Sequence, residues 1–148
     1  MGTRSFIAHQ TDLGIMAVYC HYDGYLSYNG KLLRCYYRYP EKVAKLIALG
    51  DISSLAPEIG TQHDFMDRPK EQTTFFHRDR GENWERCKPR HFATQDSLME
   101  AAADCGCEFI YLFDGWKWRY AERGAQYFGL SDGSTFSEFK LLPTKFDD

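Results

Sequence analysis

The sequence predicts an α+β domain in which two to three helices pack on one face of an antiparallel β-sheet. Three observations lead to this fold class. Apolar and polar residues alternate near the start of the chain, an aromatic hairpin pattern occupies residues 108–121, and amphipathic helical patterns lie between them. The length of 148 residues, without a repeat or a linker, indicates one globular domain over residues 1–148.

The beginning of the chain has the pattern of a strand pair. Residues 4–10 and 14–22 alternate in side-chain character and are rich in β-branched and aromatic types, and a short turn separates them. Asp23 and Gly24 then form a turn pair that tolerates a positive φ. We therefore expect two strands that end in a turn at Asp23.

Two helices are expected after this turn. Ser27 or Asn29 is suited to cap a helix over residues 30–37. Pro40 suits the first position of a second helix, which ends at about Gly50. This second segment has the clearest helical pattern in the chain, because its apolar residues recur with helical spacing.

The second half of the chain mixes irregular and regular segments. Aromatic alternation on both sides of Gly115 predicts the hairpin over residues 108–121, which we place in the central sheet. Thr94 is a suitable cap for a third helix, and a turn is expected at residues 132–133. We expect an acidic loop over residues 51–72, a short strand over 73–77 and a basic loop over 78–91. The third helix is expected over residues 94–104, and a strand or coil over 135–142.

Composition excludes several classes of protein. Hydrophobic residues make up 43% and charged residues 26%, which is ordinary for a globular domain and wrong for a disordered chain. A net charge of −3 is unlike a basic nucleic-acid coat or a strongly acidic DNA mimic. No apolar stretch reaches the length of a membrane span, and the first residues lack a signal-peptide core. We expect a cytoplasmic protein without membrane contact, and we do not expect direct nucleic-acid binding.

The cysteines predict free thiols. Their number is odd and no secretory signal is present, which argues against a disulfide framework. Cys87 and His91, together with His63 or His77, would be an alternative set of zinc ligands, but no second paired knuckle supports it. We therefore expect no structural metal and no cofactor. The five cysteines are Cys20, Cys35, Cys87, Cys105 and Cys107.

The first candidate site is the densest group of aromatic and titratable side chains, at the end of the second strand. It consists of Tyr19, His21, Tyr22, Asp23 and Tyr25. A histidine beside an aspartate can act as a base or orient a phosphate, and tyrosine rings offer flat faces to a purine. The structural alternative is that Tyr19 and Tyr22 pack on opposite sheet faces while Asp23 only forms the turn.

The second candidate site is His77, Arg78, Asp79 and Arg80. Two guanidinium groups beside a carboxylate are suited to bidentate recognition of a phosphate or carboxylate. The alternative is a solvated charged loop with weak internal pairing. The His-Arg-Asp triplet occurs in protein kinases, but their other motifs are missing here. On a loop, Arg78 and Arg80 should matter more for function than for folding.

The hairpin and the adjacent Cys20 and His21 have weaker functional interpretations. Hairpin aromatics can stack bases, but few basic residues flank them and nearby carboxylates offset these, so we expect core and edge packing. Cys20 and His21 point to opposite faces of a strand and cannot form a thiolate–imidazole pair. Sequence templates for serine hydrolases, nucleotide-binding loops and zinc proteases are absent.

Four motifs resemble a group of small, mostly uncharacterised proteins of bacteriophages and prophages. They are Tyr-Cys-His-Tyr-Asp-Gly-Tyr, Leu-Ile-Ala-Leu-Gly-Asp-Ile-Ser-Ser-Leu, His-Arg-Asp-Arg-Gly-Glu and Tyr-Leu-Phe-Asp-Gly, at residues 19–25, 46–55, 77–82 and 111–115. The chain departs from the group at Tyr22, where tryptophan is expected, and at residues 26–28, where relatives often carry a Pro-Glu-Gly-type turn. The resemblance implies a phage origin and a bacterial host cytoplasm, and it implies no role for any residue.

Small phage accessory proteins commonly act by stoichiometric binding to host machinery. We therefore expect a non-enzymatic counter-defence inhibitor, similar to an anti-CRISPR protein, whose partner is a bacterial immune protein. A first alternative is a sponge that sequesters a small signalling nucleotide in a pocket built from both candidate sites. A second is a small hydrolase or transferase acting on such a nucleotide, with His21 or His77 as its base. The sequence is also compatible with a homo-oligomer.

Overall fold

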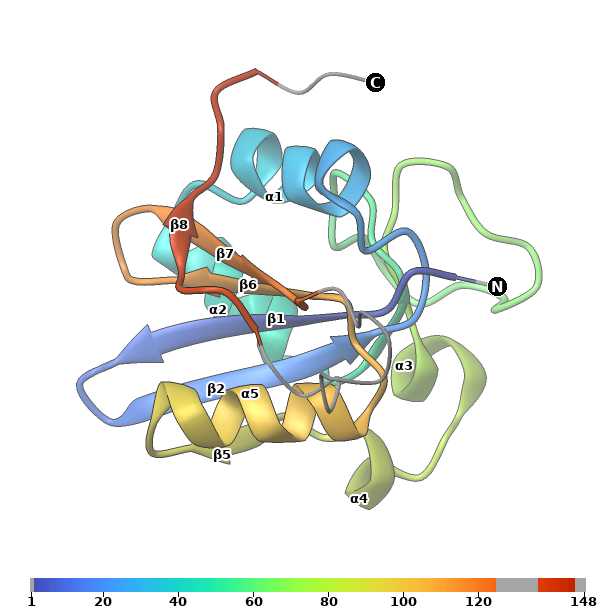
Figure 1. The fold of residues 1–148 in the computed structure, drawn as a ribbon. Coiled ribbons are helices and arrows are strands. Elements are labelled where there is room, and N and C mark those ends of the chain that lie inside the picture. Colours follow the sequence, from blue (N-terminus) through green and yellow to red (C-terminus); the bar gives the residue numbers. More distant parts are fainter. Residues whose placement is uncertain (1, 125–135, 146–148) are drawn as a thin grey trace.

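A mixed β-sheet runs through the centre of the molecule, and helices cover both of its faces (Figure 1). The structure is a computed structural model that describes residues 2–124 and 136–145. The strands are β1 (Ser5–Thr11), β2 (Gly14–Cys20), β3 (Ile52–Ser54), β4 (Thr74–Phe75), β5 (Arg90–Phe92), β6 (Phe109–Phe113), β7 (Trp118–Glu122) and β8 (Lys140–Leu141). The helices are the π-helical turn η1 (Leu26–Gly30), α1 (Lys31–Tyr36), α2 (Pro40–Ala48), α3 (Phe76–Arg80), α4 (Trp84–Cys87) and α5 (Gln95–Asp104).

The order of the strands is β4-β3-β2-β1-β6-β7-β8, and β5 also pairs with β2. The expected strand pair, β1 with β2, and the expected hairpin, β6 with β7, are both antiparallel. However, β1 pairs with β6 and β2 pairs with β3 in parallel. The prediction of an α+β domain is confirmed, and that of a wholly antiparallel sheet is wrong. Each parallel pair joins strands far apart in sequence, with helices in the connection, as parallel pairing requires.

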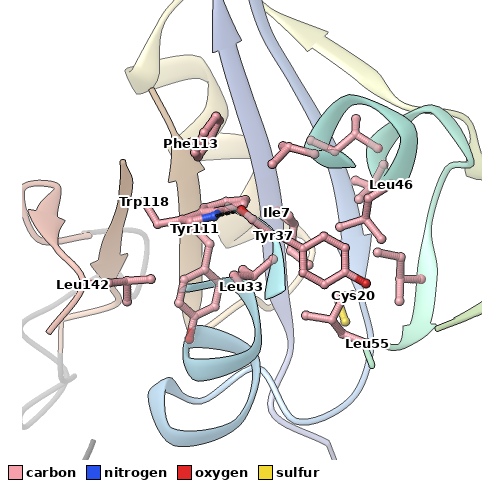
Figure 2. Packing of buried hydrophobic residues seen from close by; sticks show 14 of the residues in the cluster. Ile7, Cys20, Leu33, Tyr37, Leu46, Leu55, Tyr111, Phe113, Trp118 and Leu142 are labelled. Carbon is pink, nitrogen blue, oxygen red and sulfur yellow. Dashed lines mark hydrogen bonds between the residues drawn. The ribbon is translucent and has the colours of Figure 1, made fainter. Parts of the chain in front are cut away.

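Apolar side chains on both faces of the central strands explain why helices lie on both sides of the sheet. On one face, Ile7 and Tyr111 pack with Leu33 and Leu46 from the α1–α2 region (Figure 2). On the other face, Phe6, Ala8, Ile110 and Leu112 pack with the apolar side of α5. The prediction of helices on one face is therefore wrong. Alternate residues of β1 and β6 point to opposite faces, and both sets are apolar.

Local signals position the elements that were predicted. Pro40 lies in the first turn of α2, and Thr94 forms a capping box with Ser97 at the start of α5. The carboxylate of Asp114 accepts two turn N–H groups in the hairpin, at 2.8 Å each. Asn29 is a different case. It does not cap α1, which has no side-chain cap, and its buried amide donates instead toward the Tyr22 carbonyl oxygen at 3.3 Å.

Several short elements lie where loops were expected. Residues 51–72 contain β3, and residues 78–91 contain most of α3, all of α4 and the start of β5. The predicted strand over residues 73–77 is only β4, after which the chain turns into α3. The turn predicted at residues 132–133 lies outside the described residues. None of the described helices has the length and apolar character needed to cross a membrane.

Candidate functional site

One edge of β2 pairs with β5 and then with β3, and between these two partners the Asp51 side chain bonds to β2. Antiparallel pairing with β5 covers Ile15 to Ala17, whereas β3 pairs at Cys20. Between them, the Tyr19 N–H donates to the Asp51 carboxylate at 2.9 Å. The side chain of Asp51 thus replaces a strand partner for a backbone donor that would otherwise be left unsatisfied.

The main chain around Asp51 is fixed by α4 and α3. The Asp51 N–H donates to the Cys87 carbonyl oxygen at 2.7 Å, and the Asp51 carbonyl oxygen accepts the Phe76 N–H at 3.2 Å. Gly50 has a φ of +87°, and a Cβ at this position would collide with the Cys87 carbonyl oxygen. Glycine is therefore needed at position 50, directly before Asp51.

A cavity of about 320 Å³ adjoins Asp51 on the face of the sheet that carries α5. Its lining residues are Phe6, Ala17, Tyr19, Asp51, Arg86, Arg90 and Cys105. Buried Phe6 and Ala17 supply apolar surface, while Arg86 and Arg90 are exposed. The Arg90 guanidinium donates weakly to the Cys105 sulfur at 3.8 Å. The cavity therefore combines apolar lining with cations and hydrogen-bonding groups, as small-ligand sites do.

The charges in the cavity favour an anion. Burial raises the pKa of Asp51 to about 6, against the opposing effects of the Tyr19 N–H and of Arg90. Burial also raises the pKa of Tyr19 to about 12, so its hydroxyl stays protonated at neutral pH. Neither Arg86 nor Arg90 forms a salt bridge with any described residue. Two guanidinium groups and one carboxylate thus line the cavity, so its charged lining is positive on balance.

His21 adjoins this cavity through Tyr19. The Tyr19 hydroxyl and His21 Nδ1 are hydrogen-bonded at 2.8 Å. Burial, Arg4 and the amino terminus all lower the pKa of His21, so the ring is neutral at pH 7. Cys20 lies on the opposite face in the core, as the strand alternation predicts, and burial raises the pKa of its thiol to about 12.

The rest of the first candidate site lies outside the cavity lining. Tyr22 packs edge-on against His21, with ring centroids 4.5 Å apart. Asp23 has a φ of +58°, in agreement with the positive φ that its turn pair was expected to tolerate. The rings of Tyr25 and Tyr28 lie 6.1 Å apart, and both side chains are partly exposed. Tyr22 and Tyr25 are thus surface residues, whereas Tyr19 and His21 belong to the cavity region.

The second candidate site lies entirely on α3, and Arg78 and Asp79 form its buried half. The Asp79 carboxylate accepts Arg78 Nε at 3.0 Å and the N–H groups of Phe75 and His63 at 2.8 and 3.1 Å. Arg78 also donates to the carbonyl oxygens of Ile59 and Thr73, at 2.9 and 2.8 Å. The expectation of an exposed arginine fork on a loop is therefore wrong for Arg78, which ties α3 to the preceding loop.

Burial and hydrogen bonding act in opposite directions on Asp79. Burial raises the pKa of the Asp79 carboxyl, but hydrogen bonds from Arg78 and from the N–H groups of Phe75 and His63 outweigh it. The pKa therefore lies below its usual value, and Asp79 is ionised at neutral pH. An ionised, enclosed carboxylate with several donors is a structural anchor for the residues around it.

His77 and Arg80 are the exposed half of the second candidate site. His77 Nδ1 lies 2.7 Å from the Glu82 carbonyl oxygen, and its ring packs on Trp84 at 5.0 Å. The Arg80 guanidinium lies 5.1 Å from the centre of the Phe65 ring. No hydrogen bond, salt bridge or ring contact among the described side chains joins this site to Tyr19 or His21. The structure thus does not combine the two candidate sites into one pocket.

A second hollow, of about 800 Å³, lies along α2. Its charged lining includes Lys42 and Glu58, which form a salt bridge at 2.9 Å. Glu41 and Lys45 add one further charge of each sign, so this hollow is balanced in charge and attracts an ionic ligand less than the Asp51 cavity does. No group of three metal-ligating side chains gathers anywhere in the described part of the chain.

Sequence reasoning missed Asp51, Arg86, Arg90 and Cys105 as partners of Tyr19. They come from segments that the sequence presents as loops or helix ends, and only the sheet brings them together. One available signal was the cluster of arginines around Trp84, and another was the acid that follows Gly50 at a helix end. The chain matches no family model, no curated protein and no solved structure.

Proposed function

We propose that this protein binds a small phosphorylated molecule, of the nucleotide class, in the Asp51 cavity and holds it without turnover. With the phage resemblance, this corresponds to the sponge hypothesis, in which an accessory protein sequesters an immune signalling nucleotide. The cavity volume of about 320 Å³ lies at the lower end of the range for small-ligand pockets.

The observation that carries this proposal is the pair of arginines across from Asp51. Guanidinium groups bind phosphate oxygens in a bidentate manner and keep their charge at any physiological pH. In a chain of net charge −3, Arg86 and Arg90 make a locally positive cavity beside Tyr19. A phosphate in this cavity would have both guanidinium groups as charged hydrogen-bond donors.

Binding without turnover is supported by the hydrogen bonds that the titratable groups in and beside the cavity form. Asp51 accepts a backbone N–H, the Cys105 sulfur contacts Arg90, and His21 Nδ1 is bonded to Tyr19. Among the described residues, therefore, no thiol, serine or threonine that lines the cavity is hydrogen-bonded to a base that would activate it. The hydrolase or transferase alternative has less support for this reason.

A thermal-shift series tests the proposal. The wild-type chain is heated with inorganic phosphate, sulfate, nucleoside monophosphates and cyclic dinucleotides, each at concentrations up to millimolar. At least one phosphorylated nucleotide should raise the melting temperature, and the Arg86→Ala/Arg90→Ala variant should lose that shift. The matched control is Lys31→Ala/Lys70→Ala, which removes two exposed positive charges elsewhere. A shift that both double variants retain would overturn the proposal, and so would the absence of a shift for the whole series.

A second candidate function is stoichiometric inhibition of a bacterial immune protein, such as a CRISPR effector. One observation favours it: Tyr22, Tyr25 and Tyr28 are each about 40% exposed within one short segment. Tyrosine is enriched among the residues that dominate binding energy in protein interfaces. The two tyrosines of the first candidate site that lie outside the cavity would then contact the partner protein.

A plaque assay on a host with an active CRISPR effector tests this candidate. The Tyr22→Ala/Tyr25→Ala variant should lose protection of the phage and keep its melting temperature. The control is Tyr36→Ala/Met66→Ala, because these side chains are also exposed but lie outside the tyrosine segment. Full protection by the Tyr22→Ala/Tyr25→Ala variant would exclude this surface as the inhibitory site.

A further inference from the structure

A third hollow, a cleft, lies on the opposite face of the sheet from the Asp51 cavity, next to the turn of the β6–β7 hairpin. It has a volume of about 350 Å³. Its lining residues are Arg34, Arg38, Tyr39, Phe113, Trp116, Lys117, Trp118, Leu141, Leu142 and Thr144. Neither candidate site from the sequence contributes a residue to this cleft, which is therefore independent of the proposed function.

The apolar side of this cleft is part of the buried core. Phe113 and Trp118 are buried and pack with ring centroids 5.2 Å apart, and Leu142 lies in the same cluster (Figure 2). The Trp118 indole N–H donates to the Tyr37 carbonyl oxygen at 2.7 Å, shown as a dashed line in Figure 2. This bond links β7 to the end of α1, so the hairpin and the helix that line the cleft are held together.

Cations gather at the cleft without neutralising partners. Arg34 and Arg38 come from α1 and the residues after it, and Lys117 comes from the hairpin turn. Among the described residues, no carboxylate lines the cleft, and none of these three side chains forms a salt bridge. The nearest hairpin carboxylate, Asp114, is already occupied by Arg119 at 3.0 Å and by two turn N–H groups.

Two aromatic side chains border the cleft in exposed positions. Trp116 is 81% exposed and Tyr39 is 67% exposed, and neither takes part in a ring pair among the described residues. Exposed tryptophan is unusual, because burying so large an apolar side chain is favourable. A flat ring beside three unpaired cations is the arrangement by which proteins hold a base and its phosphates.

We propose that this cleft binds a nucleotide unit of single-stranded nucleic acid, with Trp116 stacked on the base and the three cations on the phosphates. The sequence argued against such a use because carboxylates offset the few basic residues near the hairpin. The fold removes that objection because it brings Arg34 and Arg38 from α1 and the residues after it to the hairpin, where Asp114 is already neutralised by Arg119. Charge complementarity therefore favours a strand of phosphates over a neutral ligand.

The test uses fluorescence anisotropy with a labelled oligothymidylate of about 12 nucleotides, within the site sizes of single-strand binders. The wild-type chain should bind it in a salt-dependent manner. Trp116→Ala should weaken binding roughly 5- to 150-fold, the value expected for one stacked base. Arg34→Ala/Arg38→Ala should lower the slope of log affinity against log salt by about 1.4, because each single-strand phosphate contact contributes about 0.7.

Controls distinguish the ligand source and exclude misfolding. Lys31→Ala/Lys70→Ala removes the same charge from outside the cleft and should leave the salt slope almost unchanged. Competition by free thymidine monophosphate at concentrations matched per nucleotide would assign the site to free nucleotides, and failure to compete would assign it to a strand. Near-ultraviolet circular dichroism of each variant checks that the fold is retained. The proposal is overturned if the wild-type chain does not bind the oligothymidylate, if free thymidine monophosphate competes equally well per nucleotide, or if Trp116→Ala binds as well as wild type.

Discussion

The carboxylate of Asp51 accepts the backbone N–H of Tyr19 at 2.9 Å, at the point where the edge of β2 passes from β5 to β3. One bond thus completes the sheet edge and places a half-buried acid beside Arg86 and Arg90. Because the same carboxylate is structural and lies in the proposed binding cavity, its ionisation should affect both stability and ligand affinity.

The first prediction concerns the stability of Asp51→Asn. The pKa of Asp51 is about 6 in the folded chain against an ordinary value of 3.8, so between these pH values the folded chain binds more protons. The contribution of this group to stability is therefore greatest below pH 3.8 and is lost as the pH rises through 6. Asparagine keeps an acceptor for Tyr19 but cannot ionise. Urea unfolding measures the free energy of unfolding of both chains, and from pH 4 to pH 7 the difference between them should move in favour of the variant by about 2 kcal/mol. A difference that does not depend on pH would contradict this.

The second prediction concerns anion affinity. Sulfate keeps its two negative charges between pH 5 and 7.5, so any pH dependence of its binding reports on the protein. The affinity of the wild-type chain should fall as the pH rises through about 6, because Asp51 gains its charge there. Calorimetric titration should show that Asp51→Asn has much less of this dependence, whereas an equally steep dependence in both chains would exclude Asp51 as its cause.

The third prediction separates the two arginines of α3. Arg78 pairs with the buried Asp79 and donates to two loop carbonyl oxygens, so Arg78→Ala should cost about 3–5 kcal/mol of stability. Arg80 is exposed, and Arg80→Ala should stay within about 0.5 kcal/mol. Denaturant unfolding of both variants measures the difference. Equal stabilities would mean that the Arg78 network contributes little to the fold.

The fourth prediction concerns the Tyr19–His21 pair. Tyr19→Phe removes the hydroxyl that lies 2.8 Å from His21 Nδ1, at a cost of about 0.5–1.5 kcal/mol. If the hydroxyl donates to the neutral ring, its loss should raise the pKa of His21, followed as the NMR titration of its ring protons. Tyr22→Phe is the control, because the ring of Tyr22 packs on His21 by its edge and is retained. An unchanged His21 titration in Tyr19→Phe would show that the hydroxyl does not stabilise the neutral ring.

Much of the fold could be predicted because it depends on local signals. Pro40, Thr94 and the turn at Gly115 mark α2, α5 and the β6–β7 hairpin within a few residues of their positions. The elements that were missed, such as β3 and β5, are three residues long and are stabilised by pairing with β2 rather than by their own pattern. Parallel pairing of β1 with β6 joins strands about a hundred residues apart, and no local pattern specifies it.

The candidate site was predictable only in part, for the same reason. Strand alternation places Tyr19 and His21 on one face, and the structure shows them in contact. Their neighbours Asp51 and Arg90 are brought together by the change of strand partner along β2, which depends on the tertiary fold. Arg78 shows the converse: its charge suggested a ligand, but its hydrogen bonds to loop carbonyl oxygens depend on a loop path that the sequence did not reveal.

The most direct test of the central claim is mass spectrometry of the small molecules that the purified chain releases on heating. The chain is produced in bacteria whose nucleotide-based immune signalling is active, together with the Arg86→Ala/Arg90→Ala and Lys31→Ala/Lys70→Ala variants. Our account predicts about one phosphorylated nucleotide per chain from the wild type and from the lysine variant, and almost none from the arginine variant. A wild-type chain that releases no more phosphorylated compound than the Arg86→Ala/Arg90→Ala variant would contradict it.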